Sequence, residues 1–308
     1  MKERNFVTSS GHRIHYYESG AGSKTFVFIH AQGTDSSSYF DVSKTLEKQA
    51  RVVLVDCFGH GRSTKDNSLY RLDIIGDAIA ELISAVTEEN VTLVGHSSGG
   101  LIASYIASKT NLCEKLILED PPFFASQGER RFSTFNYVDL STICHNYLAQ
   151  QEERDFVLYY FSNQYAWNFF PEKSRKKIRQ KLIRTAAAYR QKHPDKSLKV
   201  LFWPKAASDS FKGMNNYDPW FGENFYNDLF HTHIDYPSLL RGIECETIFL
   251  KAKTNIDNNG LQMCALSEDD LKKVMSLIPK CSVIHFDCGH GIHVEKKKDF
   301  LAQCLKSL

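Results

Sequence analysis

The 308-residue chain lacks a strong excess of charge, a long apolar run and a closely spaced pair of cysteines. Its 38 Lys and Arg residues nearly balance 36 Asp and Glu residues, and a net charge of +2 creates no field that would attract nucleic acid. The densest basic stretch, Lys173 to Lys181, is typical of the solvated face of a helix. No apolar run approaches the roughly 18 residues of a membrane span, and the charged start Met1 to Asn5 is unlike a secretory signal. We therefore expect a cytoplasmic protein that binds neither nucleic acid nor membranes.

The eight cysteines are scattered through predicted strands and helices. A secreted disulfide scaffold has densely spaced cysteines, and zinc or redox sites commonly have C-x-x-C pairs; the sequence has neither pattern. We expect reduced thiols, most of them small buried side chains, in a protein that uses no metal ion and no other cofactor.

Strand and helix patterns alternate along most of the chain, which predicts an α/β fold with a doubly wound, mostly parallel sheet and helices on both faces. The expected strands are Phe6 to Ser9, Arg13 to Ser19, Thr25 to His30, Arg51 to Cys57, Val91 to His96, Lys115 to Asp120, Thr247 to Ala252 and Ser282 to Asp287. The expected helices are Tyr39 to Lys48, Leu72 to Val86, Gly99 to Lys109, Asp269 to Leu277 and Phe300 to Leu305, with Ser267 and Asp270 as a capping box before the fourth.

Between Pro122 and Tyr236 the alternation stops, and the segment is helical where it is periodic. It is rich in aromatic residues: Phe123, Phe124, Phe132, Phe135, Tyr147, Phe156, Tyr159, Tyr160, Phe161, Trp167, Phe169, Phe170, Phe202, Trp203, Trp220, Phe221 and Phe225. A helical insertion between two strands cannot join the sheet, so we expect it to cover the carboxyl ends of the strands, where open α/β folds bind ligands. The chain therefore divides into a core of residues 1–121 and 237–308 and a helical cap of residues 122–236. A minority of the rings should line a pocket.

The most informative motif is a nucleophile elbow, G-x-S-x-G, formed by Gly95 to Gly99 around Ser97. A β-rich run precedes it and a helical pattern follows it, which is the context that the motif requires. The elbow is useful only where it exposes the serine oxygen beside a base and beside backbone N–H donors. Ser97 is therefore the candidate nucleophile.

Four motifs in the right order resemble the α/β-hydrolase fold family over nearly all of the chain outside the cap. The stretch His30 to Gly33 looks like the family's His-Gly turn, with Ala31 in place of the usual glycine. Asp56 to Ser63 is similar to the D-x-x-G-x-G-x-S loop. The elbow around Ser97 comes third, and Cys288 to Gly291 matches the loop that supplies the catalytic base.

The resemblance implies a role for each matched residue. Ser97 would attack a carbonyl carbon, and His290 would accept its proton and return it to the leaving group, which an imidazole with a pKa near 6.5 does well at neutral pH. The backbone N–H groups of Gln32 and Ser98 would hold the oxyanion. His293, three residues after His290, is the local competitor for the role of base.

The acid of the triad has several candidates. In the commoner arrangement of the family it follows the strand after the cap, where this chain has Asn255 in the expected slot and Asp257 two residues later. In the other arrangement it ends the strand after the elbow helix, which makes Asp120 the equivalent position. We assign Asp120, with Asp257 as the alternative; Glu119, or no carboxylate at all, remains open.

A serine at the elbow excludes haloalkane dehalogenases and epoxide hydrolases of this fold, which need an aspartate there. The triad fits ester, lactone, thioester, amide or vinylogous C–C hydrolysis, and the aromatic cap favours an apolar or aromatic ester or lactone. The expected activity is hydrolysis of a small-molecule carboxylic ester through an acyl-enzyme. The sequence leaves open whether the chain forms a homodimer. Two other functions are a slow-turnover small-molecule receptor on the same fold, suggested by the irregular acid and by Ala31, and a lyase that forms no covalent intermediate.

Overall fold

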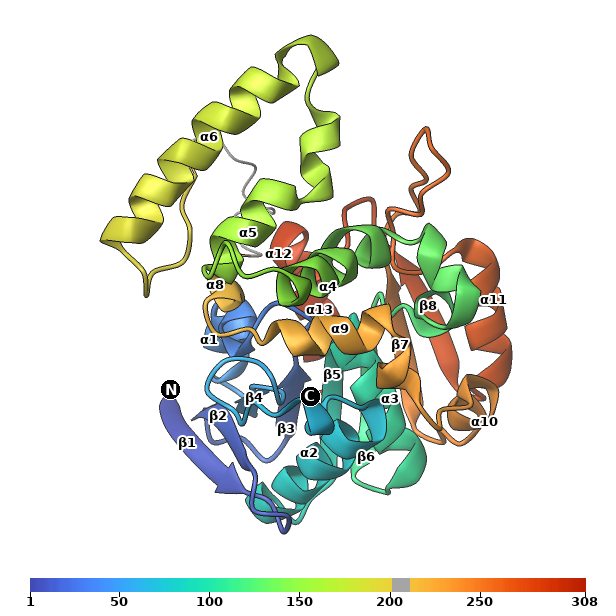
Figure 1. The fold of residues 1–308 in the computed structure, drawn as a ribbon. Helices are drawn as coiled ribbons and strands as arrows, with labels where there is room; N and C mark the ends of the chain where they lie inside the picture. The colour runs from blue at the N-terminus through green and yellow to red at the C-terminus, as the bar shows by residue number, and fades with distance from the viewer. Residues whose placement is uncertain (201–210) are drawn as a thin grey trace.

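The computed structural model describes residues 1–200 and 211–308, and the centre of this part of the chain is an eight-stranded sheet (Figure 1). The strand order is β1-β2-β4-β3-β5-β6-β7-β8. Strands β3 to β8 pair in parallel, whereas β2 pairs antiparallel with both β1 and β4. The strands are β1 (Lys2–Val7), β2 (Arg13–Ser19), β3 (Thr25–Ile29), β4 (Arg51–Val55), β5 (Val91–His96), β6 (Cys113–Glu119), β7 (Glu246–Lys251) and β8 (Cys281–His285).

Helices cover both faces of the sheet, so the predicted doubly wound fold is confirmed (Figure 1). Successive side chains of a strand enter opposite cores: Val27 and Ile29 of β3 belong to one buried cluster, Phe26 and Phe28 to the other. Both faces of the sheet are buried, and for this reason the sequences of the central strands are continuous apolar runs. The first cluster includes residues of α2 (Leu72–Val86), α3 (Ser98–Lys109), α10 (Tyr236–Arg241) and α11 (Glu268–Leu277); the second includes residues of α1 (Phe40–Leu46) and α13 (Lys297–Leu305).

Three local features differ from the sequence prediction. Strand β1 begins at Lys2 rather than Phe6, because its exposed residues pair with β2 at the sheet edge and carry no apolar alternation. A 3₁₀ turn, Ser36–Tyr39, precedes α1. The short helix α12 (Ile292–Glu295) was not predicted. The capping box is present, since Ser267 Oγ accepts a hydrogen bond from the backbone N–H of Asp270 at 3.2 Å.

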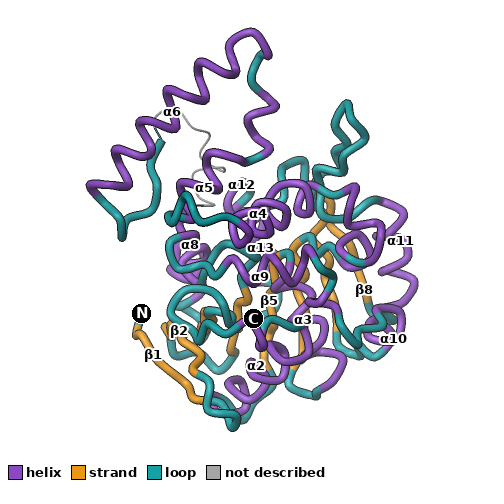
Figure 2. Tube along the Cα trace, in the orientation of Figure 1, coloured by secondary structure: helices purple, strands orange, loops and turns teal. Residues whose placement is uncertain are grey.

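The insertion between β6 and β7 consists of helices and loops in its described part, and α6 projects from the body of the molecule (Figure 2). Its helices are α4 (Thr142–Ala149), α5 (Phe156–Asn163), α6 (Glu172–Lys192), α8 (Phe211–Met214) and α9 (Pro219–Tyr226). Its 3₁₀ and π turns are η3 (Phe123–Ser126), η4 (Gly128–Ser133), η5 (Tyr137–Ser141), η6 (Tyr165–Phe169) and η7 (Leu229–His231). No helix in the described ranges is long and apolar enough to cross a membrane.

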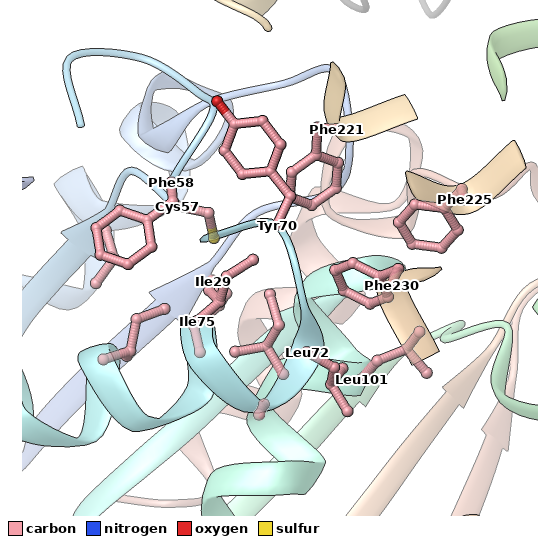
Figure 3. Close-up of a cluster of buried hydrophobic side chains, with 14 of the residues drawn as sticks. Ile29, Cys57, Phe58, Tyr70, Leu72, Ile75, Leu101, Phe221, Phe225 and Phe230 are labelled. Carbon is pink, nitrogen blue, oxygen red and sulfur yellow. The ribbon is translucent and has the colours of Figure 1, made fainter. Parts of the chain in front are cut away.

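One aromatic cluster fixes the insertion to the core (Figure 3). The ring of Phe221 on α9 lies 5.5 Å from that of Tyr70, just before α2. The Phe225 and Phe230 rings stack at 4.3 Å, and both belong to the same buried cluster as Leu101 of α3. These rings are nearly or fully buried, so the contact stabilises the position of α9 over α2 and α3.

Candidate active site

Ser97 lies in the sharp turn between β5 and α3, with φ 54° and ψ −120°. A non-glycine residue with positive φ is strained and is maintained only where its surroundings fix it. Here Gly95 and Gly99 allow close packing: a Cβ at Gly99 would lie 2.2 Å from the carbonyl oxygen of Ile29. The backbone N–H of Ser97 donates to Glu119 O on β6 at 2.9 Å. The strand, turn and helix therefore have the geometry of an elbow.

Asp120 occupies a second strained turn, with φ 45°, directly after β6. Its N–H donates to Leu250 O on β7 at 3.0 Å, and its side chain is fully buried. Its Oδ2 lies 2.8 Å from His290 Nδ1, and its Oδ1 lies 3.7 Å from Nζ of the equally buried Lys251. The carboxylate is therefore held between an imidazole and an ammonium group.

His290 lies in the loop after β8, and 36% of its side chain is exposed. Because Nδ1 donates its proton to Asp120, the second ring nitrogen, Nε2, is the one that can act as a base. Among the described residues Ser97 Oγ has no hydrogen-bond partner, and Ser97 and His290 line the same cavity. In a structure without substrate, catalytic hydrogen bonds are often long or absent.

The alternative acid, Asp257, lies elsewhere. It follows β7 in a loop, where its carboxylate accepts hydrogen bonds from the Tyr165 hydroxyl and from the backbone N–H of Leu261. The Tyr165 hydrogen bond lowers the pKa of this carboxyl. Asn255 is exposed on the same loop. The structure brings neither residue to His290.

Two other candidates, Glu119 and His293, contact each other. The backbone N–H and the Nδ1 of His293 lie 2.8 Å from Glu119 Oε1, and both side chains are buried. Burial opposes ionisation of Glu119, but the electrostatic attraction of His293 and its hydrogen bonds lower the pKa of that carboxyl to about 2. His96 packs between the two histidines, with ring centroids 4.5 Å from His290 and 5.2 Å from His293. Burial lowers the pKa of His96 to about 3, so its imidazole is neutral at physiological pH.

The two expected oxyanion donors lie together beside Ser97. Ser98 is the first residue of α3, where a backbone N–H has no partner within the helix. The backbone N–H of Gln32 donates to Ser98 Oγ at 2.8 Å, so it is already engaged in this structure. The neighbouring Gly33 N–H donates to His60 Nε2 at 3.1 Å, which fixes the turn after β3 to the loop after β4.

The buried carboxylate of Asp56 joins three segments under this turn. It accepts hydrogen bonds from the backbone N–H of Ser36 at 2.9 Å, from that of Arg62 at 3.0 Å, and from His15 Nδ1 at 2.8 Å. Burial raises the pKa of Asp56, but the hydrogen bond from His15 and the electrostatic and hydrogen-bonding contributions of its other neighbours outweigh that effect and lower it to about 2. The D-x-x-G-x-G-x-S loop therefore holds the turn that presents Gln32.

A cavity of about 830 Å³ lies between the sheet and the insertion. The core contributes Ser97, Ser98, Gln32 and His290 to its wall. Five of the aromatic residues singled out in the sequence also line it: Phe135, Tyr160, Phe169, Phe170 and Phe225. Phe202 and Trp203 lie outside the described residues.

One group of described side chains has the ligand types of a divalent metal site: His96, Glu119 and His293, whose ligand atoms lie within 4.8 Å of one another. The hydrogen bonds of Glu119 with His293 already explain why these three side chains are close.

The sequence interpretation missed the pairing of Glu119 with His293 and the buried Lys251 beside Asp120. Lys251 ends the apolar strand β7. A lysine at the carboxyl end of a buried strand was the sequence signal that could have indicated a charged residue beside the site. For the histidine, the signal was its spacing of three residues from His290; His290 lies in the loop before α12, and His293 lies in its first turn.

Comparison with known proteins supports the fold. Residues 24–196, more than half of the chain, match the family described as the alpha/beta hydrolase fold. An uncharacterized protein of Mycobacterium tuberculosis is 32% identical over 114 residues, 37% of this chain and 33% of that protein. A 2-hydroxy-6-oxononadienedioate/2-hydroxy-6-oxononatrienedioate hydrolase of Paraburkholderia phymatum is 32% identical over 115 residues, 34% of this chain and 39% of its own length. The matched stretch thus spans less than half the length of each of these relatives.

Among solved structures, an esterase from Exiguobacterium antarcticum superposes with a TM-score of 0.67 at 15% identity, over 99% of both chains. At that identity the likeness concerns the fold alone.

Proposed function

Because the chain belongs to the α/β-hydrolase fold family, we propose that it is a serine hydrolase that cleaves an apolar or aromatic carboxylic ester or lactone. One observation carries the proposal: His290 Nδ1 lies 2.8 Å from the buried Asp120 carboxylate, in the loop that faces the cavity beside the elbow residue Ser97. A serine needs a base, and the base needs a group that fixes its tautomer.

In the first half of the reaction, Ser97 Oγ attacks the carbonyl carbon while His290 Nε2 takes the hydroxyl proton. Asp120 holds Nδ1–H and stabilises the imidazolium that forms. His290 then gives the proton to the leaving oxygen, and an acyl-Ser97 ester remains. Water attacks this ester with His290 again as the base, and Ser97 is released with a carboxylic acid.

The tetrahedral oxyanion would accept hydrogen bonds from the backbone N–H groups of Ser98 and Gln32. Each such donor contributes roughly 3 to 4 kcal/mol to the transition state. Gln32 N–H donates to Ser98 Oγ in the free protein, so the Ser98 hydroxyl has to release it as the oxyanion forms.

The cavity supports an apolar substrate. Aromatic and aliphatic side chains of the insertion form much of its wall, and burial of apolar groups is the main source of affinity in such pockets. Esterases are among the structural neighbours, and the Paraburkholderia relative is named as a hydrolase of a dienedioate, which agrees with attack on a carbonyl compound.

Steady-state hydrolysis of p-nitrophenyl butanoate tests the proposal. Ser97→Ala and His290→Ala should each lower kcat by on the order of 10⁴, and the double variant should lose no more, because the two groups act as one unit. Asp120→Asn should lose about 10³ to 10⁴, and the matched control Asp257→Asn should stay within threefold of wild type. Residual activity of Ser97→Ala within tenfold of wild type contradicts the assignment.

A slow-turnover receptor is the second candidate, and the engaged Gln32 N–H favours it. If this donor is not released, the oxyanion has one hydrogen bond fewer and deacylation slows. A receptor would give a single burst of p-nitrophenol equal to the protein concentration, whereas an enzyme would cycle many times.

A further inference from the structure

Among the described residues of the insertion, one buried carboxylate lines the cavity. Asp139 belongs to the π turn η5, is 2% exposed and lines the same cavity as Ser97 and His290. The proposed triad does not use it.

The contacts of Asp139 are hydrogen bonds from neutral groups. Its Oδ2 accepts from the Tyr160 hydroxyl at 2.6 Å, and its Oδ1 accepts from the backbone N–H of Tyr165 at 2.5 Å. A carboxylate has about four acceptor sites, so capacity remains on both oxygens.

No cation of the described residues forms an ion pair with Asp139. Tyr160 on α5 and Cys144 on α4 face it. The nearby helix α9 carries the acid Glu223, which contacts His145 of α4. The two arginines of η4 are engaged elsewhere, Arg130 with Asp270 and Arg131 with Asp228.

A buried ionised carboxylate without a countercharge is unfavourable. Burial accordingly raises the pKa of Asp139 to about 6, so at pH 8 the group is mostly ionised in spite of its surroundings. Aromatic faces also attract cations, and Tyr160, Phe135 and Phe170 line the same cavity.

We propose that Asp139 and the surrounding aromatic side chains form a binding site for a cationic nitrogen, and that the substrates are esters or lactones with an ammonium group remote from the reacting carbonyl. The substrate assignment rests on the proposed hydrolase function; the cation site does not. The ligand would supply the countercharge that the described residues do not provide.

Binding is tested without catalysis, by titration calorimetry with hexyltrimethylammonium, a cation that does not titrate. At pH 8 we expect wild type to bind it at least tenfold more tightly than Asp139→Asn. The matched control is Asp41→Asn, which removes a largely exposed carboxylate from the wall of the same cavity and should leave the dissociation constant unchanged. Equal affinity of wild type and Asp139→Asn, or no binding by wild type, overturns the proposal.

The pH dependence of wild type provides a second measurement that needs no variant. Affinity for hexyltrimethylammonium should be constant above pH 7 and fall as the pH drops through about 6, because Asp139 becomes neutral. Affinity that stays constant between pH 8 and pH 5 contradicts the cation site, even if the Asn variant does not fold.

A kinetic comparison tests the substrate class. The 4-nitrophenyl esters of 6-(trimethylammonio)hexanoic acid and of its uncharged isostere 7,7-dimethyloctanoic acid differ only in charge. The ratio of their kcat/KM values should fall at least tenfold in Asp139→Asn, and continued cleavage of the neutral ester by this variant shows that it is folded. An unchanged ratio overturns the substrate assignment. If wild type cleaves neither ester, the hydrolase proposal fails, and the calorimetric result still decides the cation site.

Discussion

The Nδ1 atom of His293 lies 2.8 Å from Oε1 of Glu119, in a buried pair immediately beside the contact between His290 and Asp120. Two neighbouring acids at the end of β6 thus hold two histidines three residues apart. The His290 side chain is partly exposed to the cavity, whereas that of His293 is only 4% exposed. We infer that the first pair is catalytic and that the second fixes the start of α12, and with it the His290 loop.

Glu119→Gln separates these roles. Glu119 is a buried carboxylate that accepts hydrogen bonds from His293. Loss of a hydrogen bond to a charged group costs about 1.5 to 3 kcal/mol of unfolding free energy, so urea denaturation should show a clear loss of stability. The kcat for p-nitrophenyl butanoate should fall less than tenfold, because Asp120 and His290 keep their contact. A loss of about 10³ in kcat with unchanged stability would place Glu119 in the catalytic machinery instead.

Stability should decrease in acid. The pKa values of Asp56 and Glu119 lie near 2 in the folded protein, below the ordinary values of the two acids. A lowered pKa stabilises the fold above the ordinary pKa, and this contribution is lost as the pH falls from about 4.5 towards 2. Urea midpoints measured at pH 7, 5, 4 and 3 should therefore fall steeply below pH 5. In Glu119→Gln the fall should be smaller, and midpoints that stay constant to pH 3 would contradict both assignments.

The elbow depends on Gly99. A methyl group there would lie 2.2 Å from Ile29 O and 2.5 Å from His30 O, both of them backbone atoms that cannot rotate away. Gly99→Ala should lower the thermal midpoint by more than 5 °C or prevent soluble expression. Gly291→Ala is the matched control, because its nearest neighbours lie 3.9 Å away and its φ of −90° suits alanine. Equal midpoints for the two variants would show that α3 packs less closely against the end of β3 than the structure indicates.

The core of the fold could be predicted from the sequence because local signals and tertiary structure agree there. The expected ranges Leu72 to Val86 and Val91 to His96 coincide with α2, where the helical periodicity is strong, and with β5, where every residue is buried. The start of β1 could not be predicted, since Lys2 to Arg4 carry charges and are held by pairing with β2.

The residues of the candidate site also divide into those that could be predicted from the sequence and those that could not. Ser97 and His290 belong to local motifs, which can be recognised within a few residues. The acid of the triad belongs to no such local motif, because Asp120 and Asp257 differ only in whether the folded chain brings them to His290. The structure pairs Asp120 with His290 and Asp257 with Tyr165, and long-range contacts of this kind leave no trace in residue spacing. The cation site has the same origin, since Asp139 becomes exceptional only when folding buries it with no ion-pair partner among the described residues.

The most direct test of the serine mechanism is intact-mass spectrometry of the protein after reaction with a fluorophosphonate, followed by peptide mapping. A nucleophilic Ser97 activated by His290 predicts one phosphonyl adduct per chain, located on the peptide that contains Ser97. The adduct should be absent in Ser97→Ala and should form at least a hundredfold more slowly in His290→Ala and Asp120→Asn, but at the wild-type rate in Asp257→Asn. A chain that stays unlabelled while it hydrolyses esters, or one labelled at another residue, would contradict an acyl-enzyme on Ser97.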